Sequence, residues 1–401
     1  MHTRNLLLAV PAVAAVVSLL AACAPMASSP GKRELMVVGI DEKVVFIDGK
    51  QTLVAPGKDA VSIVDIGTDP LAPRMVASLP LMNSIFGPPV NLAITPDETL
   101  AIVANSMDWQ QDGSNWKAVP DNKLYVIDLT ANPPAQIATV EVGKQPSGLS
   151  INKAGNLALV ANRADNSISV LSIQGKDVKL IDTVPMGEQV AHVVFTPDGK
   201  RALVAKFPGH KVAVLNVDGQ KVTDSKHNMN VGLWPYNVDV VPDGSIALTA
   251  DNGFAGGSDG NVDTVSVIDL EATPPRVIDR VVVGDAPEGL AISPKGNLAA
   301  AILLRGSNQA WSSWLYNRNG SVVILKIDGK KVTKLDEVEV RGLPEGAVWS
   351  ADGKYLFVGN YMDSDVSILR VDETKKGIRV INTGKSLKLP GQPASMRGRN
   401  Q

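Results

Sequence analysis

A turn of the Pro-Asp-Gly type recurs along the chain and sets the frame of an internal repeat. Degenerate forms of this turn are centred on six residues: Asp97, Ala154, Asp198, Asp243, Lys295 and Asp352. The shortest spacings are 44 residues, from Ala154 to Asp198, and 45 residues, from Asp198 to Asp243. The longer spacings indicate insertions into the same unit. A regular repeat of this length restricts the chain to architectures in which similar units pack side by side.

Each unit carries four short strand signals. In residues 148–184 these are GLSIN, LALVAN, SISVLSI and VKLIDTV, separated by turns that contain Gly, Asn or Asp. Short strands rich in Val and Ile favour a sheet. No helical hydrophobic period is convincing outside the N-terminal segment. Four strands per unit of about 44 residues are typical of a propeller blade.

The number of units predicts seven blades. Six units begin near Asn91, Gly148, His192, Asn237, Gly289 and Gly346. A seventh is split: residues 35–66 contain LMVVGI, KVVFID and AVSIVDI, and GQPASM at 391–396 supplies the missing first strand. Pairing the two chain ends removes the exposed sheet edges. We therefore predict an all-β, seven-bladed propeller of four-stranded antiparallel blades over residues 34–396, with a disordered tail at 397–401.

The N-terminal segment predicts export. An apolar run at residues 6–20 follows Arg4, and Leu20-Ala21-Ala22-Cys23 resembles a bacterial lipobox, in which the cysteine is acylated. We expect residues 1–22 to be a signal peptide and residues 23–33 a lipidated tether. Ala24 after the cysteine resembles the default for the periplasmic face of the outer membrane of a Gram-negative bacterium. The alternative is a secretory signal with a chance cysteine.

Composition removes several classes of function. The net charge is −2 and no basic stripe stands out, so no nucleic-acid partner is expected. Cys23 is the only cysteine, which excludes thiolate catalysis and a cysteine-ligated zinc site. No Gly-x-Ser-x-Gly or His-Glu-x-x-His motif occurs. We expect a monomer that needs no cofactor, with Ca²⁺ held by Glu288, Asn91 and Asn237 as a further possibility.

Two motifs carry a resemblance to a known family. Second strands end in Ile102-Val-Ala-Asn105, Leu159-Val-Ala-Asn162 and Phe357-Val-Gly-Asn360, and units start with Pro-x-Gly at Pro146, Pro287 and Pro344. In these features the chain resembles the seven-bladed propellers of the YVTN-repeat and lactonase-like superfamily. The resemblance implies the fold. It leaves function open, because such propellers include lactonases, lyases, dehydrogenase subunits and binding proteins.

The entering loops of the units should converge on one channel mouth. The residues brought together are His192, Glu288, Glu345, Asn91 and Asn237. At the position that His192 occupies in its unit, three other units carry glycine. In a lactonase-type hydrolase or isomerase, His192 would be the acid or base, tuned by Glu288 or Glu345. Arg163 or Lys206 would stabilise the oxyanion. The alternative is a set of salt bridges among Arg163, Lys206 and the two glutamates.

Aromatic residues gather in loops expected on the same face. Insertions at 106–121, 253–263 and 305–320 fall between second and third strands. They carry four of the six tryptophans, and the expected ligand-binding residues on this face are Trp109, Trp116, Trp234, Tyr236, Asn91, Asn237, Asp251, Arg305, Trp311, Trp314 and Tyr316. A hydrophobic cap is the alternative. Our main hypothesis is an envelope-anchored propeller that binds a small molecule or a partner protein through these loops. The lactonase-type enzyme is the second.

Overall fold

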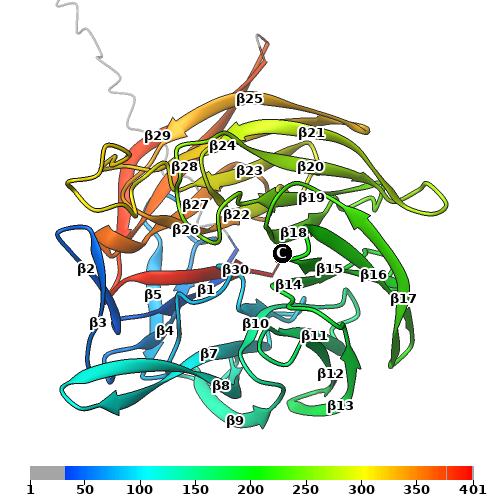
Figure 1. The fold of residues 1–401 in the computed structure, drawn as a ribbon, viewed down its shortest axis with the longest axis horizontal. Helices are drawn as coiled ribbons and strands as arrows, with labels where there is room; N and C mark the ends of the chain where they lie inside the picture. The colour runs from blue at the N-terminus through cyan, green and yellow to red at the C-terminus, as the bar shows by residue number, and fades with distance from the viewer. Residues whose placement is uncertain (1–31, 376, 400–401) are drawn as a thin grey trace, which may run out of the picture. The chain divides into compact units, whose positions relative to one another are not determined.

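The computed structural model describes residues 32–375 and 377–399, and 28 of its strands form seven four-stranded antiparallel sheets (Figure 1). Six sheets follow chain order. Their strands are β6 (Leu92–Ile94), β7 (Leu100–Asp112), β8 (Asn115–Asp128), β9 (Ala135–Glu141); β10 (Pro146–Ile151), β11 (Leu157–Asn162), β12 (Ser167–Gln174), β13 (Asp177–Pro185); β14 (His192–Phe195), β15 (Arg201–Lys206), β16 (Lys211–Asp218), β17 (Lys221–Asn230); β18 (Pro235–Val240), β19 (Ile246–Asp251), β20 (Asp263–Asp269), β21 (Arg276–Gly284); β22 (Pro287–Ile292), β23 (Leu298–Leu303), β24 (Ser321–Asp328), β25 (Lys331–Glu339); β26 (Pro344–Trp349), β27 (Tyr355–Asn360), β28 (Asp365–Thr374), β29 (Gly377–Lys388).

The seventh sheet joins the two ends of the described chain and confirms the predicted split blade. Its order is β30 (Pro393–Gly398), β1 (Leu35–Ile40), β4 (Ala60–Asp65) and β5 (Arg74–Leu79). Val38 of β1 pairs with Met396 of β30 in antiparallel register. The seven-bladed, all-β prediction is therefore correct. The predicted tail boundary is wrong, because β30 extends to Gly398 and Arg397 is only 2% exposed.

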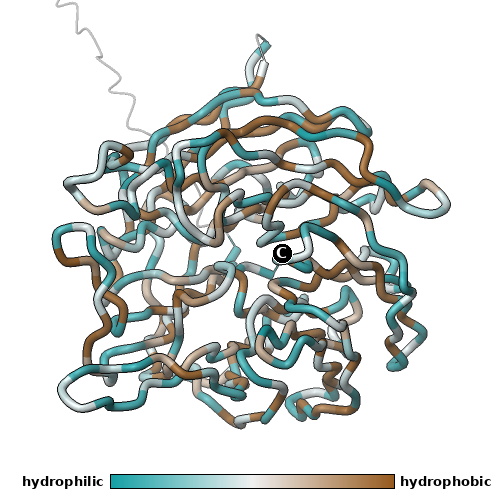
Figure 2. The backbone as a smooth tube through the Cα atoms, in the orientation of Figure 1, coloured by the Kyte–Doolittle hydropathy of each residue, from teal (hydrophilic) through white to brown (hydrophobic). Residues whose placement is uncertain are grey.

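The blades pack through apolar faces of their inner strands. One interface joins Leu159 and Val170 of one blade to Val193 and Val204 of the next. Figure 2 shows the corresponding hydrophobic stretches running along the strands. Glycine permits the close approach at the axis: a Cβ on Gly289 would lie 2.4 Å from the Glu345 carbonyl oxygen. Successive side chains of a strand point to opposite faces, so each inner strand can pack apolar residues against both neighbouring blades.

Three insertions leave the repeat where the sequence predicts, between second and third strands. Residues 106–121 extend β7 and β8 into one long hairpin, and residues 253–262 and 304–320 form loops. The structure contains a fourth insertion that the repeat does not predict. KVVFID is not a blade strand, because β2 (Val44–Ile47) pairs only with β3 (Lys50–Leu53) in a separate hairpin. The outer strand of that blade is β5.

Within residues 32–375 and 377–399, the remaining regular element is the 3₁₀ helix η1 (Tyr361–Asp363). The Tyr361 hydroxyl donates to the Val44 carbonyl oxygen at 2.6 Å, which anchors the base of the β2–β3 hairpin. Within the described ranges, no helix has the length and apolarity to cross a membrane. The predicted signal peptide and the acylated Cys23 lie outside the described residues, so lipid anchoring stays a prediction.

Candidate functional site

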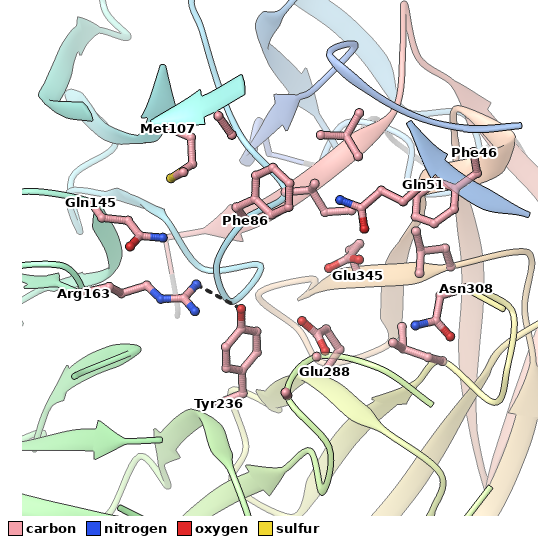
Figure 3. Close-up of a pocket in the computed structure, with 17 residues that line it drawn as sticks. Phe46, Gln51, Phe86, Met107, Gln145, Arg163, Tyr236, Glu288, Asn308 and Glu345 are labelled. Carbon is pink, nitrogen blue, oxygen red and sulfur yellow. Dashed lines mark hydrogen bonds between the residues drawn. The ribbon is translucent and has the colours of Figure 1, made fainter. Parts of the chain in front are cut away.

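A cavity of about 480 Å³ lies at one end of the inner strands (Figure 3). Its polar lining comes from Gln51, Gln145, Arg163, Tyr236, Glu288, Asn308 and Glu345. Its apolar lining includes Val44, Phe46, Ile85, Phe86, Met107, Leu304 and Leu343. The volume is in the range of small-molecule sites. The lining residues come from inner strands, from the β2–β3 hairpin and from the β7–β8 hairpin.

Two buried carboxyl groups form the acidic side of this cavity. Glu288 and Glu345 occupy the second position of β22 and β26, and they are 6% and 3% exposed. Asn252 Nδ2 donates to Glu288 Oε2 at 2.8 Å, whereas Glu345 Oε2 has no hydrogen-bond partner among the residues that the structure describes. Burial raises the pKa of Glu288 to about 8, against a smaller lowering by Arg163. Burial, and then the charge of Glu288, raise the pKa of Glu345 well above its usual range.

A cation and a phenol face the two carboxyls in Figure 3. Arg163 follows the last residue of β11, and its Nη1 donates to the Tyr236 hydroxyl oxygen at 3.1 Å. The guanidinium lies over the Phe207 ring at 4.7 Å, which fixes its plane. Burial raises the pKa of Tyr236 to about 12. Tyr236 therefore keeps its proton at every physiological pH and can donate it to a ligand.

Aromatic pairs hold the apolar side in place. Phe86 stacks on Trp109 at 6.1 Å between ring centroids, and Phe46 meets Tyr361 edge to face at 6.2 Å. Gly87 has φ 154°, and a Cβ there would lie 2.6 Å from Ser147 Oγ. Only glycine lets this loop approach the inner strand so closely. The wall is thus built before any ligand arrives.

His192 does not reach this cavity, contrary to the predicted catalytic role. The side chain is fully buried, with Val238 N donating to its Nδ1 at 3.3 Å and Arg397 Nη2 at 3.2 Å from its Nε2. Burial, and then the charge of Arg397, lower its pKa well below the usual range. The imidazole is therefore neutral and contacts Val238 of the next blade and Arg397 of the blade that closes the ring. This explains why one unit carries histidine where others carry glycine.

Other predicted polar residues also lie elsewhere. Lys206 forms an ion pair with Glu188 at 3.0 Å, so the predicted bridge from Lys206 to the cavity glutamates is wrong. Asp251 is buried and accepts hydroxyl hydrogen bonds from Thr249, Thr264 and Ser266; burial raises its pKa to about 6. Among the residues the structure describes, neither Glu288 nor Glu345 forms an ion pair.

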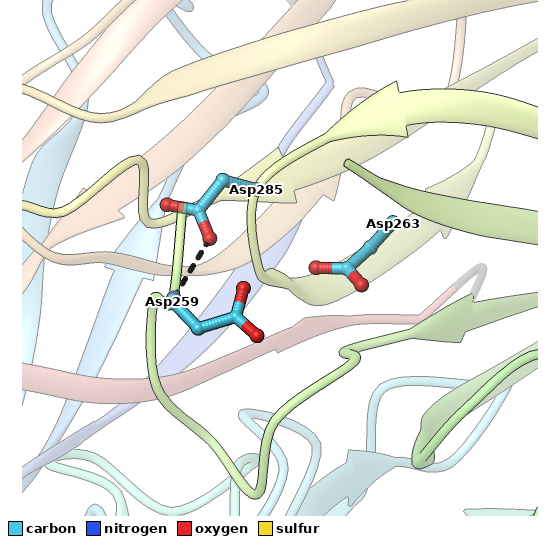
Figure 4. Close-up of side chains that lie close together, drawn as sticks. All are labelled: Asp259, Asp263 and Asp285. Atoms are coloured by element: carbon cyan, nitrogen blue, oxygen red, sulfur yellow. Dashed lines mark hydrogen bonds between the residues drawn. The ribbon is translucent and has the colours of Figure 1, made fainter. Parts of the chain in front are cut away.

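The predicted metal ligands do not assemble either. Asn91 and Asn237 donate to the Ser84 and Leu290 carbonyl oxygens, and neither lines the cavity with Glu288. A different acidic group, Asp259, Asp263 and Asp285, has carboxylate oxygens within 4.8 Å of one another (Figure 4). Burial raises the pKa of Asp263 to about 6, with smaller contributions from neighbouring carboxylates. Asp285 Oδ1 accepts hydrogen bonds from the backbone amides of Asp259 and Gly260.

The predicted aromatic surface is divided among several places. Trp109 supports the cavity wall from behind, and Trp234 packs edge-on against Phe207 at 5.1 Å. Trp116 and Tyr316 are half-buried outside the cavity. Trp311 and Trp314 are 61% and 88% exposed, and Arg305, 3.7 Å from Glu337, lines a separate groove with Trp314. Of the predicted ligand-binding residues, Tyr236 alone lines this cavity.

Comparisons with known proteins agree on the fold. The matching family model is "Lactonase, 7-bladed beta-propeller", over residues 128–233. No curated protein sequence matches the chain. A Bacteroides fragilis protein assigned as a 6-phosphogluconolactonase has a TM-score of 0.68 and 17% identity, covering 91% of this chain and 98% of its own. The periplasmic gluconolactonase of Pseudomonas aeruginosa has a TM-score of 0.62 and 18% identity over 92% and 99%.

A more distant function shares the same fold. Hydrazine synthase of Kuenenia stuttgartiensis has a TM-score of 0.56 and 20% identity, covering 73% of this chain and 79% of its own. At these identities the solved structures establish architecture alone. The resemblance predicted from the Val-Ala-Asn and Pro-x-Gly motifs is confirmed: residues 128–233 match the lactonase model, and the described chain has the seven-bladed propeller fold of that family.

Proposed function

We propose that this chain hydrolyses a lactone in the cavity by acid–base catalysis between Glu288 and Glu345. The observation that carries the proposal is a pair of buried carboxyls with raised pKa values, facing a guanidinium–tyrosine pair across an open cavity. Raised carboxyl pKa values suit proton transfer near neutral pH. The lactonase family match and the likeness to gluconolactonases support the reaction class.

The two carboxyls take different roles because Asn252 Nδ2 donates to Glu288 Oε2, which favours the ionised form, whereas no described residue donates to Glu345 Oε2. Ionised Glu288, oriented by Asn252, accepts a proton from water as its oxygen attacks the lactone carbonyl carbon. Tyr236 donates its hydroxyl proton in a hydrogen bond to the developing oxyanion, and Arg163 supplies positive charge behind it.

Protonated Glu345 then completes the reaction. As the carbon–oxygen bond of the ring breaks, its proton passes to the leaving alkoxide. The products are a hydroxy acid and a carboxyl pair that has exchanged one proton. Proton transfer from Glu288 back to Glu345 restores the starting state, and the balance is lactone plus water to hydroxy acid.

Acid release measures this activity directly. Glucono-δ-lactone and dihydrocoumarin are the two substrates, followed in a pH-stat with purified residues 24–401. Glu288→Gln keeps the acceptor for Asn252 but cannot take a proton, so we expect kcat to fall about 10²- to 10⁴-fold. Asp251→Asn is the matched control, since Asp251 is also a buried acid with a raised pKa but lies outside the cavity. Binding without acid release, or wild-type activity in Glu288→Gln, would contradict the proposal and favour a binding propeller.

A further inference from the structure

We propose that this cavity selects uncharged lactones and discriminates against those that carry a phosphate group. The inference rests on the proposed hydrolase function and concerns the substrate class of the same site. It follows from the charges that line the cavity, from the cations nearby that are already engaged, and from the composition of the opposite wall.

The cavity offers one cation to a ligand. Of the described residues that line it, Arg163 alone is positively charged, and its guanidinium is shared with Tyr236 and the Phe207 ring. Proteins bind phosphate dianions with several Arg or Lys donors or with clustered backbone amides. A single guanidinium, already engaged on two sides, does not meet that need.

Two neighbouring lysines cannot supply the missing charge. Lys206 is committed to Glu188 at 3.0 Å. Lys43 is fully buried and makes ion pairs with Asp41 and Asp59, beneath the Trp109 ring. The Lys43 ammonium would have to leave two buried carboxylates in order to reach a ligand, which is strongly unfavourable. The charge of Lys206 is already matched by the half-buried Glu188, so neither lysine forms a latent phosphate site.

The acidic side acts against a charged ligand. Glu288 and Glu345 share one cavity, and the charge of Glu288 already favours the protonated form of Glu345. A dianion brought into the same space would favour protonation of Glu288 as well. The cavity would then lose the carboxylate that activates water. A phosphorylated lactone would therefore bind weakly and also suppress its own hydrolysis.

The opposite wall fits an uncharged ring. Phe46, Phe86 and Met107 present apolar surface, on which the carbon face of a lactone can pack. Gln51, Gln145 and Asn308 add neutral amides, and Asn308 Oδ1 is buried without a partner. Amides of this kind accept hydrogen bonds from hydroxyl groups without demanding charge. Hydrocarbon lactones can pack against the apolar part of this wall, and polyol lactones can also form hydrogen bonds with its amides.

Matched substrates test the selectivity. Glucono-δ-lactone and its 6-phosphate differ only in the phosphate, and the rates above spontaneous hydrolysis are compared for wild type and Glu288→Gln. We expect kcat/KM to be at least tenfold higher for the unphosphorylated lactone. Equal rates, or a faster phosphorylated substrate, would overturn the selectivity while leaving the hydrolase function intact.

Binding of a non-hydrolysable pair separates the two proposals. Isothermal calorimetry with 1,5-anhydroglucitol and 1,5-anhydroglucitol 6-phosphate reports selectivity whether or not turnover occurs. The phosphate compound should bind at least tenfold more weakly, and tighter binding would refute the inference. Gln145→Arg places a second guanidinium beside Arg163 and should narrow this ratio, whereas Gln145→Met, which adds no charge, should not. An unchanged ratio in Gln145→Arg would count against the charge argument.

Discussion

Two groups of buried titratable side chains lie on the inner strands, and they differ in what their free atoms face. Glu288 and Glu345 line a cavity, and Glu345 Oε2 has no hydrogen-bond partner. His192 is fully enclosed, and its ring nitrogens contact the Val238 amide and Arg397. Both groups have strongly shifted pKa values because both are desolvated. Burial and a shifted pKa therefore do not identify a site. Access to a cavity separates the two groups, because Arg397 Nε in the enclosed group also lacks a hydrogen-bond partner among the described residues.

Loss of the cavity cation should give the largest effect on the rate after loss of Glu288. Arg163→Met removes the charge that polarises Tyr236 and stabilises the developing oxyanion, so we expect kcat for glucono-δ-lactone to fall about 10²- to 10³-fold. The same change removes the influence that lowers the pKa of Glu288, so the rising limb of the pH–rate profile should move to higher pH. A rate loss without this displacement would mean that Arg163 does not act on the carboxyl pair.

The enclosed histidine should show the opposite pattern. His192→Ala removes a side chain from a closed interior and strands the Arg397 guanidinium, so we expect a loss of about 2–4 kcal/mol in the free energy of unfolding. Urea denaturation measures this loss. The kcat of the folded fraction should stay within about threefold of wild type, because His192 does not line the cavity. A stable variant without activity would restore the catalytic role predicted from the sequence.

The contrast between the cavity carboxyls and His192 also shows which parts of the fold and of the site can be predicted from the sequence alone. The turn spacing and Val-rich strands predict the blades, and the ring closure follows from the unpaired chain ends. Alignment of the entering loops correctly brings Tyr236, Glu288 and Glu345 together. It errs by one position for His192, Asn91 and Asn237, because successive side chains in a strand point in opposite directions. One set reaches the cavity and the next lies between the inner strands.

The apolar wall could not be predicted in the same way. Phe46 and Met107 come from hairpins that interrupt the repeat, and Phe86 comes from the loop before β6. Their positions depend on contacts made once in the molecule, such as Phe86 on Trp109 and Tyr361 beneath Phe46. Periodicity carries no information about such contacts. The concentration of tryptophans in the insertions correctly indicates the hairpin of Trp109, which supports the cavity wall. It indicates Trp311 and Trp314 equally, although both are exposed outside the cavity.

The pH dependence of hydrolysis tests whether Glu288 acts as the base and whether His192 stays neutral. With its pKa raised by burial to about 8, Glu288 is protonated in most molecules at pH 7. We expect kcat/KM to rise close to tenfold per pH unit below pH 7 and to level off above pH 8. His192, held neutral by its low pKa, should contribute no inflection between pH 6 and pH 8. A profile that is flat from pH 5 to pH 8 would contradict the assignment of Glu288 as the base.

The smallest effect concerns stability. Each cavity carboxyl has a folded-state pKa above its unfolded value, so the folded protein retains protons that the unfolded chain releases above about pH 4.5. The contribution of this pair to stability is therefore fully present below that pH and is lost as pH rises through the folded pKa. Glu345→Gln is neutral at every pH and removes part of this decline. We expect it to match or slightly reduce wild-type stability at pH 5 and to exceed wild-type stability at pH 9. Urea midpoints at both pH values measure the difference, with His192→Ala as the comparison. The imidazole is neutral in both the folded and the unfolded chain above about pH 8, so the deficit of His192→Ala should be the same at pH 8 and pH 9. A deficit that changes between these two pH values would show that the enclosed group is not as isolated from solvent as its contacts indicate.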